Sequence, residues 1–129
     1  MTALETALTL APKREEALVY AAAVAAQLGR TESALEYWQR AIEVNLWSPR
    51  SHYELAKLLS QSRQWSKALS EAEEARRLNP FHLETRLLLI NCYLERGEKE
   101  RARAEFDELL RFNPTNAVDL RRWFDQAMR

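Results

Sequence analysis

The side chains best suited to metal binding or nucleophilic chemistry in this sequence are His52, His82 and Cys92. Imidazole and thiolate groups are preferred zinc ligands, and a protein zinc site uses three or four protein ligands at characteristic spacings. These residues provide neither a sufficient set of ligands nor the required spacing. We therefore assign no metal site. We expect Cys92 to be a buried packing residue, because it stands within an apolar helical run.

The residue patterns of common catalytic sites do not occur in the sequence. Gly29 and Gly97 are the only glycines, and they lie too far apart to form a phosphate-binding loop. No grouping of serine, histidine and aspartate falls at the ends of the expected helices, and the glutamates are scattered over faces that we expect to be exposed to solvent. We therefore predict that the protein is not an enzyme and that it has no cofactor.

The charge balance and the apolar runs narrow the class of partner. Nineteen lysines and arginines match nineteen aspartates and glutamates, which disfavours a nucleic-acid binder, including a helical-repeat RNA-binding protein. The longest run without charge, residues 17–29, is much shorter than the roughly 20 residues of a transmembrane helix. A single cysteine is typical of a reducing compartment. We expect a cytoplasmic protein that binds neither nucleic acid nor a membrane.

The residue pattern repeats along the chain with a period of about 34 residues. Ala34, Ala68 and Ala102 form one ladder at this constant spacing, and Gly29 and Gly97 lie two periods apart. Within each period, apolar residues recur at intervals of three and four, which is the spacing of a helix face. A breaker near the middle divides each period into two helices. The sequence therefore predicts an all-α protein built from helical hairpins.

This helix-turn-helix unit resembles the tetratricopeptide repeat. The resemblance depends on residues that match the signature positions of that family. In the three successive units they are Ala22, Ala34, Trp38 and Ala41; Leu55, Ala56, Ala68, Ala75 and Pro80; and Leu89, Tyr93, Ala102, Phe106 and Pro114. Leu46, His52 and Arg86 depart from the signature. The resemblance implies an all-α fold, a right-handed α-solenoid of tetratricopeptide-like repeats with a C-terminal capping helix.

The repeats and their flanks are expected to form a single domain. We place the repeats at residues 15–48, 49–82 and 83–116, and a half repeat that holds only a second helix at residues 1–14. Residues 117–129 are expected to form the capping helix, because the last repeat would otherwise leave an apolar face in water. The apolar stripe of this helix comprises Leu120, Trp123, Phe124 and Ala127.

The resemblance also implies a concave groove, lined by the first helix of each unit, that holds a segment of another protein. Transferred to this sequence, the groove positions of the family include Tyr20, Arg50, Tyr53, Lys57, Leu87 and Asn91. The capping helix adds Arg121 and Arg122 to this predicted partner-binding set. Such a set suits a partner segment with apolar anchors and acidic groups. The alternatives are that Tyr53 only packs between helices and that the basic residues are solvated partners of nearby glutamates.

These features predict a non-catalytic interaction scaffold that holds a peptide segment or helix of a partner protein. A second hypothesis is a self-assembly module, because the lone second helix at residues 2–11 lacks its usual partner helix and offers an apolar face to another copy. A third is that the chain is the repeat region of a larger protein whose other part carries the activity.

Trp47 and Phe81 lie one period apart in the connections between units, where the family usually has polar residues. We expect each ring to fold back over its own helix end as a small satellite cluster. The alternative is a second apolar strip on the surface of the protein.

Overall fold

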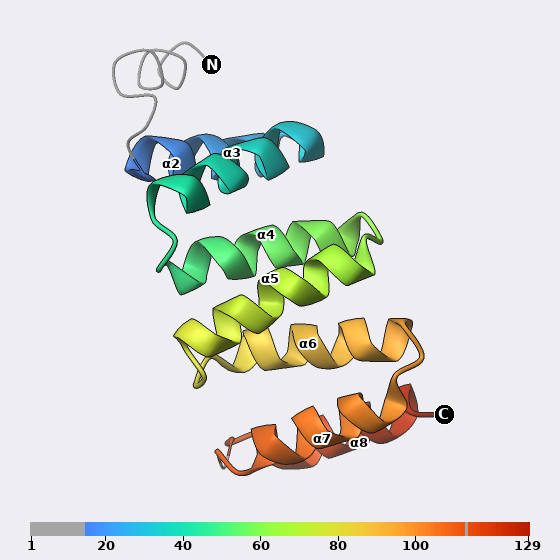
Figure 1. Ribbon diagram of the computed structural model, residues 1–129. Coiled ribbons are helices and arrows are strands. Elements are labelled where there is room, and N and C mark those ends of the chain that lie inside the picture. Colours follow the sequence, from blue (N-terminus) through green and yellow to red (C-terminus); the bar gives the residue numbers. More distant parts are fainter. Residues whose placement is uncertain (1–14, 113) are drawn as a thin grey trace.

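The computed structural model describes residues 15–112 and 114–129. Within these residues the chain forms seven α-helices and no strand. They are α2 (Glu15–Gln27), α3 (Thr31–Val44), α4 (Pro49–Gln61), α5 (Trp65–Leu78), α6 (Leu83–Glu95), α7 (Lys99–Leu110) and α8 (Ala117–Ala127). The helices stack one after another, from α2 and α3 at one end to α7 and α8 at the other (Figure 1). The half repeat expected at residues 1–14, with the self-assembly segment at 2–11, lies outside the described residues.

The helices pair along the chain at a constant step. Helix α2 packs against α3, α4 against α5 and α6 against α7, and successive pairs meet through α3 and α4 and through α5 and α6. Equivalent helices start 34 residues apart. The first helices begin at Glu15, Pro49, Leu83 and Ala117, and the second helices at Thr31, Trp65 and Lys99. Each pair buries its apolar face against its neighbours, which is the arrangement of an α-solenoid. The predicted fold class is therefore confirmed.

The turn inside each helix pair has the same backbone geometry. Gly29 and Gly97 have φ angles of 75° and 77°, in the left-handed region where glycine is unstrained. Arg63 takes the corresponding place in the middle pair with a φ of 60°. In each turn the next N–H donates to a carbonyl five residues earlier, which closes the helix end. These hydrogen bonds are Arg30 to Ala25 (2.8 Å), Gln64 to Leu59 (2.9 Å) and Glu98 to Tyr93 (2.8 Å).

The start of α4 follows from two adjacent residues. The Oγ atom of Ser48 accepts a hydrogen bond of 3.3 Å from the N–H of Ser51, and Pro49 occupies the first turn. A serine cap satisfies a free N–H at the helix start, and proline loses nothing there because its position needs no donor. Both roles are typical of these residue types at the beginning of a helix.

The alanines that recur at the repeat period lie in the core of the stack. Ala34, Ala68 and Ala102 are all fully buried, each on the second helix of its pair. A methyl group at a helix crossing allows the two axes to approach closely. Trp38 and Phe106 are buried as well, so the large side chains at the signature aromatic positions also belong to the core.

Helix α8 covers the end of the stack as the predicted cap. The rings of Phe106 on α7 and Phe124 on α8 stack with their centroids 4.2 Å apart, and Leu120 is also buried. Trp123 is 37% exposed and Ala127 is exposed, so the buried part of the stripe is narrower than predicted. Among the described residues, no helix combines the length and the apolar character that crossing a lipid bilayer requires.

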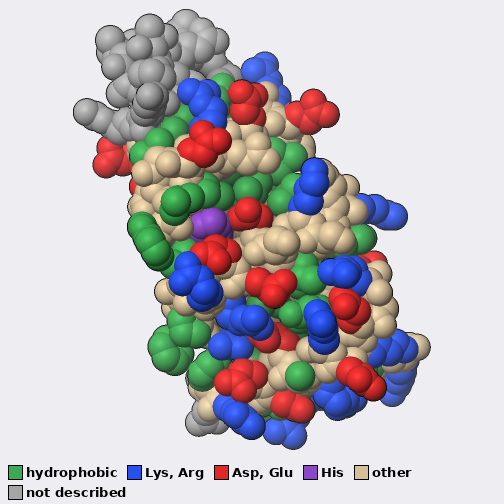
Figure 2. Space-filling view, in the orientation of Figure 1, with side chains coloured by type: hydrophobic (Ala, Val, Ile, Leu, Met, Phe, Trp, Pro, Cys, Tyr) green, Lys and Arg blue, Asp and Glu red, His purple; other side chains and the backbone are tan. Residues whose placement is uncertain are grey.

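The rings in the turns between pairs contradict the sequence prediction. Trp47, in the α3–α4 turn, is 70% exposed, and Phe81, in the α5–α6 turn, is 75% exposed. Neither ring is therefore covered by its own helix end. Figure 2 shows hydrophobic side chains on the edge of the molecule where these turns lie. The alternative interpretation, an apolar strip on the surface, fits the structure better.

Candidate partner-binding groove

One face of α4 carries three side chains of the predicted partner-binding set together with Glu54. Arg50, Tyr53, Glu54 and Lys57 follow one another at intervals of three, one and three residues, which places them on the same side of a helix. The opposite side of α4 is buried in the core. The burial of that apolar side therefore orients the polar face outward.

A cavity of about 450 Å³ lies between α2 and α4. Helix α4 contributes Arg50, Glu54 and Lys57 to its wall. Small side chains of α2, including Ala23, leave the space open, and buried Trp38 from α3 contributes to the lining. The cavity thus combines an apolar surface with charged groups, which is the usual composition of a site for a peptide side chain.

A second cavity, of about 320 Å³, lies between α4 and the α5–α6 turn. Arg50 and Glu54 line it as well, so the two cavities adjoin; we call them together the α4 groove. Tyr53, Asn79 and His82 complete the wall of the second cavity. Asn79 and His82 were not predicted, because they belong to a turn and not to the helix positions that the family uses.

The ring of Tyr53 makes an aromatic contact, and the surroundings of its phenol raise its pKa. Its ring meets the ring of His82 edge-on, with the centroids 4.9 Å apart. Burial raises the pKa of the Tyr53 phenol, and the negative charges of Glu54 and Glu84 raise it further. The phenol therefore keeps its proton at neutral pH and can donate a hydrogen bond to a ligand. The contact with His82 also agrees with the alternative that Tyr53 packs between helices.

The other predicted groove residues do not line these two cavities. Tyr20 is exposed on α2, while Leu87 and Asn91 are half-buried on α6, where Leu87 packs against the core. Arg121 and Arg122 are exposed on α8. The structure therefore brings together Arg50, Tyr53 and Lys57 from the predicted set, with the carboxylate of Glu54 among them.

The third helix pair contains a buried ion pair that the sequence pattern did not indicate. The sequence predicts exposed glutamates, but Glu105 is only 6% exposed, and Arg86 is 5% exposed. Arg86 donates to Glu105 at 2.8 Å and to the carbonyl of Pro80 at 2.8 Å. Arg76 donates to the other oxygen of Glu105 at 2.5 Å. The prediction was wrong here because a pair of side chains on two different helices leaves no local pattern.

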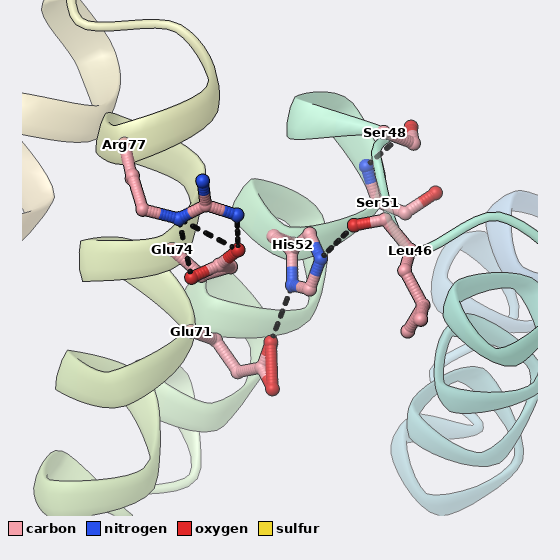
Figure 3. Close-up of polar contacts among 7 residues, drawn as sticks. All are labelled: Leu46, Ser48, Ser51, His52, Glu71, Glu74 and Arg77. Carbon is pink, nitrogen blue, oxygen red and sulfur yellow. Dashed lines mark hydrogen bonds and ion pairs between the residues drawn. The ribbon is translucent and has the colours of Figure 1, made fainter.

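A matching contact lies one repeat earlier. The two ring nitrogens of His52 lie 2.8 Å from a carboxylate oxygen of Glu71 and 3.0 Å from the carbonyl of Leu46 (Figure 3). Both partners are acceptors, and a neutral imidazole donates to one of them at a time. Arg86, Glu105 and Pro80 occupy the same places in the next repeat. We call each set a junction brace, because it ties the first helix of a pair to its second helix and to the preceding turn.

The described residues offer little for metal or thiol chemistry. Within residues 15–112 and 114–129, no group of three or more histidine, cysteine, aspartate or glutamate side chains is placed to hold a metal ion. Cys92 is fully buried, as predicted. Burial raises the pKa of its thiol to about 11, so the thiol stays protonated at neutral pH.

One family model matches the chain. The tetratricopeptide repeat model matches residues 53–117, which is half of the chain. The chain belongs to the tetratricopeptide repeat family. It is accordingly a protein-interaction repeat domain, of a family whose members are typically non-catalytic scaffolds. No curated protein matches the chain by sequence.

Solved structures share the fold at low sequence identity. A crystal structure of MamA protein superposes with a TM-score of 0.80 and 19% identity, over 91% of this chain and 66% of that one. A second crystal structure of MamA gives a TM-score of 0.83 and 16% identity, over 98% and 84%. The TPR domain of Arabidopsis OM64 gives 0.76 and 16%, over 87% and 94%. At these identities the likeness concerns the fold alone.

Proposed function

We propose that this domain binds a peptide segment or helix of a partner protein in the α4 groove and that it has no catalytic role. The observation that carries the proposal is that Arg50, Tyr53, Glu54 and Lys57 share one face of α4 and line two adjoining cavities. In this proposal the repeats are residues 15–48, 49–82 and 83–116, closed by a cap at 117–129.

The lining of the groove indicates the chemistry of the bound segment. An apolar anchor of the partner fits against Trp38 and the small side chains of α2, where burial of apolar surface drives binding. Arg50 and Lys57 favour an acidic side chain of the partner, and Glu54 accepts a hydrogen bond from a main-chain N–H or a basic group. The protonated phenol of Tyr53 donates to a main-chain carbonyl.

Peptides selected from a phage-displayed library test the proposal. Wild-type protein selects the peptides, and fluorescence anisotropy then measures the affinity of an enriched peptide. We expect Tyr53→Ala combined with Lys57→Glu to weaken binding at least about tenfold, because the pair removes a hydrogen-bonding ring and reverses a charge in the groove. The same two proteins, used as baits in a pull-down from the source cells, then identify the natural partner.

A matched control separates the groove from nonspecific charge effects. Lys67→Glu reverses the same kind of charge at an exposed position of α5, on the second helix of the pair. We expect this variant to bind the peptide as the wild type does. Equal affinity of wild type and the Tyr53–Lys57 double variant, with both proteins folded by circular dichroism, would place the binding surface elsewhere.

A further inference from the structure

Two turns of the stack present an aromatic ring in the same way. Asn45 ends α3 and Asn79 ends α5, one repeat apart. The side-chain oxygen of Asn45 accepts from the N–H of Trp47 at 3.1 Å, and that of Asn79 from the N–H of Phe81 at 3.3 Å. Each turn is therefore stabilised by a hydrogen bond from its backbone to its own asparagine. A ring carried by such an ordered turn loses little conformational entropy when a partner buries it.

Each of these rings lies beside a further exposed apolar side chain. The ring of Phe112 meets that of Phe81 edge-on, with centroids 5.4 Å apart, and Leu46 precedes Trp47 in its turn; both are exposed. The guanidinium of Arg77, at the end of α5, lies 5.9 Å from the centre of the Trp47 ring. We call Leu46, Trp47, Phe81 and Phe112 the edge strip. None of them lines the α4 groove.

We propose that the edge strip is the contact surface of a weak homodimer, in which Trp47 of one copy packs on Phe81 of the other. The strip is self-complementary. Its two principal rings stand one repeat apart on equivalent turns, so a two-fold axis between them forms the same contact twice. Leu46 and Trp47 on one side of the axis then face Phe81 and Phe112 of the second copy.

The electrostatics favour a second copy as the occupant. The chain has a net charge of zero, so two copies do not repel one another at long range. The charges beside the strip are already matched within the chain, since Arg77 pairs with Glu74 and Arg111 pairs with Glu108. The strip thus lacks an excess charge that would select a strongly acidic or basic partner.

The size of the strip indicates a weak dimer. A fully buried aromatic side chain contributes roughly 150–250 Å², so three rings and a leucine provide several hundred Å² per copy. A standard stable interface buries about 800 Å² per partner. We therefore expect a dissociation constant of roughly 10 µM to 1 mM.

Sedimentation velocity over roughly 1 µM to 1 mM tests the proposal on the full chain. We expect the wild type to pass from monomer to dimer within this range. Trp47→Ala combined with Phe81→Ala should weaken dimerisation at least about tenfold without lowering the melting temperature, because both rings are exposed in the monomer. Leu28→Ala, an exposed leucine in the α2–α3 turn, is the matched control and should dimerise as the wild type does.

A mixture of the two single variants tests the two-fold arrangement. A mixed dimer of Trp47→Ala and Phe81→Ala keeps one intact Trp–Phe contact, whereas each variant alone keeps none. We expect the mixture to associate several-fold more tightly than either variant alone.

Three results would overturn the proposal. The first is a wild type that stays monomeric over the whole range. The second is a Trp47–Phe81 double variant that dimerises as the wild type does. The third is a dimer that depends on residues 1–12 and not on the strip, which would assign the contact to the N-terminal segment. Tyr53→Ala combined with Lys57→Glu is expected to leave the dimer intact, so the strip and the α4 groove are tested independently.

Discussion

The helix crossings and the junctions between repeats obey different rules in this protein. At the crossings the same residue recurs, since Ala34, Ala68 and Ala102 are all fully buried. At the fourth position of each repeat, three different residues stand: Leu18, His52 and Arg86. All three are buried, but the first is apolar and the other two belong to junction braces.

The difference arises because a helix crossing and a junction between repeats impose different packing requirements. A crossing limits the distance between two helix axes, and only a small side chain meets that limit. A junction encloses a volume beside a backbone carbonyl, and either an apolar side chain or a polar pair with matched hydrogen bonds can fill it. Sequence variation is therefore expected at the junctions, provided that both members of a polar pair change together.

The largest expected effect is at the third junction. Glu105→Ala should lower the free energy of unfolding by about 3 to 5 kcal/mol, because Arg86 is left buried without its carboxylate. Urea denaturation measures the loss. Replacing both Arg86 and Glu105 by leucine copies the apolar solution of Leu18 and should recover most of the stability. A double variant as unstable as Glu105→Ala would show that the polar pair cannot be exchanged.

A smaller loss is expected at a crossing. Ala68→Leu should cost about 1 to 3 kcal/mol, because the fully buried methyl leaves no room for a larger side chain. Ala68→Gly serves as the comparison: it should lose about 1 to 2 kcal/mol, because it lowers helix propensity and removes a buried methyl group without overpacking the crossing. Thermal melts that show no loss for Ala68→Leu would contradict the assignment of this position to a close helix contact.

The second junction should tolerate change better than the third. Glu71 is 29% exposed at its side chain, so it can turn to water when its partner is removed. We expect His52→Leu to cost about 1 kcal/mol, the value of an ordinary hydrogen bond. Glu71→Gln retains an acceptor for the imidazole and should change stability little. A loss for His52→Leu as large as that for Glu105→Ala would remove the distinction between the two braces.

The smallest effect, and one of opposite sign, is expected in a turn. Arg63 has a φ of 60°, whereas glycine holds the corresponding place in the other two turns. Arg63→Gly should raise the free energy of unfolding by about 1 kcal/mol, because it removes left-handed strain. Gly97→Ala is the mirror experiment and should lose about the same amount; a Cβ there would meet no atom within 4 Å, so only backbone strain changes. Urea denaturation of both variants compares the two effects.

Much of the fold could be predicted from local spacing. The constant repeat period, the glycines of the turns, the cap at Ser48 and the buried alanines all follow from residue types and their spacing along the chain. The lining of the α4 groove could be predicted in part. Arg50, Tyr53 and Lys57 share a face because the helix period sets that face, but no spacing within one helix relates them to Arg121 on α8.

The order of residues along the chain sets which segments are helices, where they turn and which of their faces are apolar, because these properties depend on residues close in sequence. Packing between helices and repeats, in contrast, leaves Trp47 and Phe81 exposed and buries Arg86 and Glu105. The physical reason is that the burial of a side chain depends on what another repeat places over it. Trp47 and Phe81 lie in turns that the neighbouring repeats leave exposed, whereas Arg86 and Glu105 lie where two helices pack together.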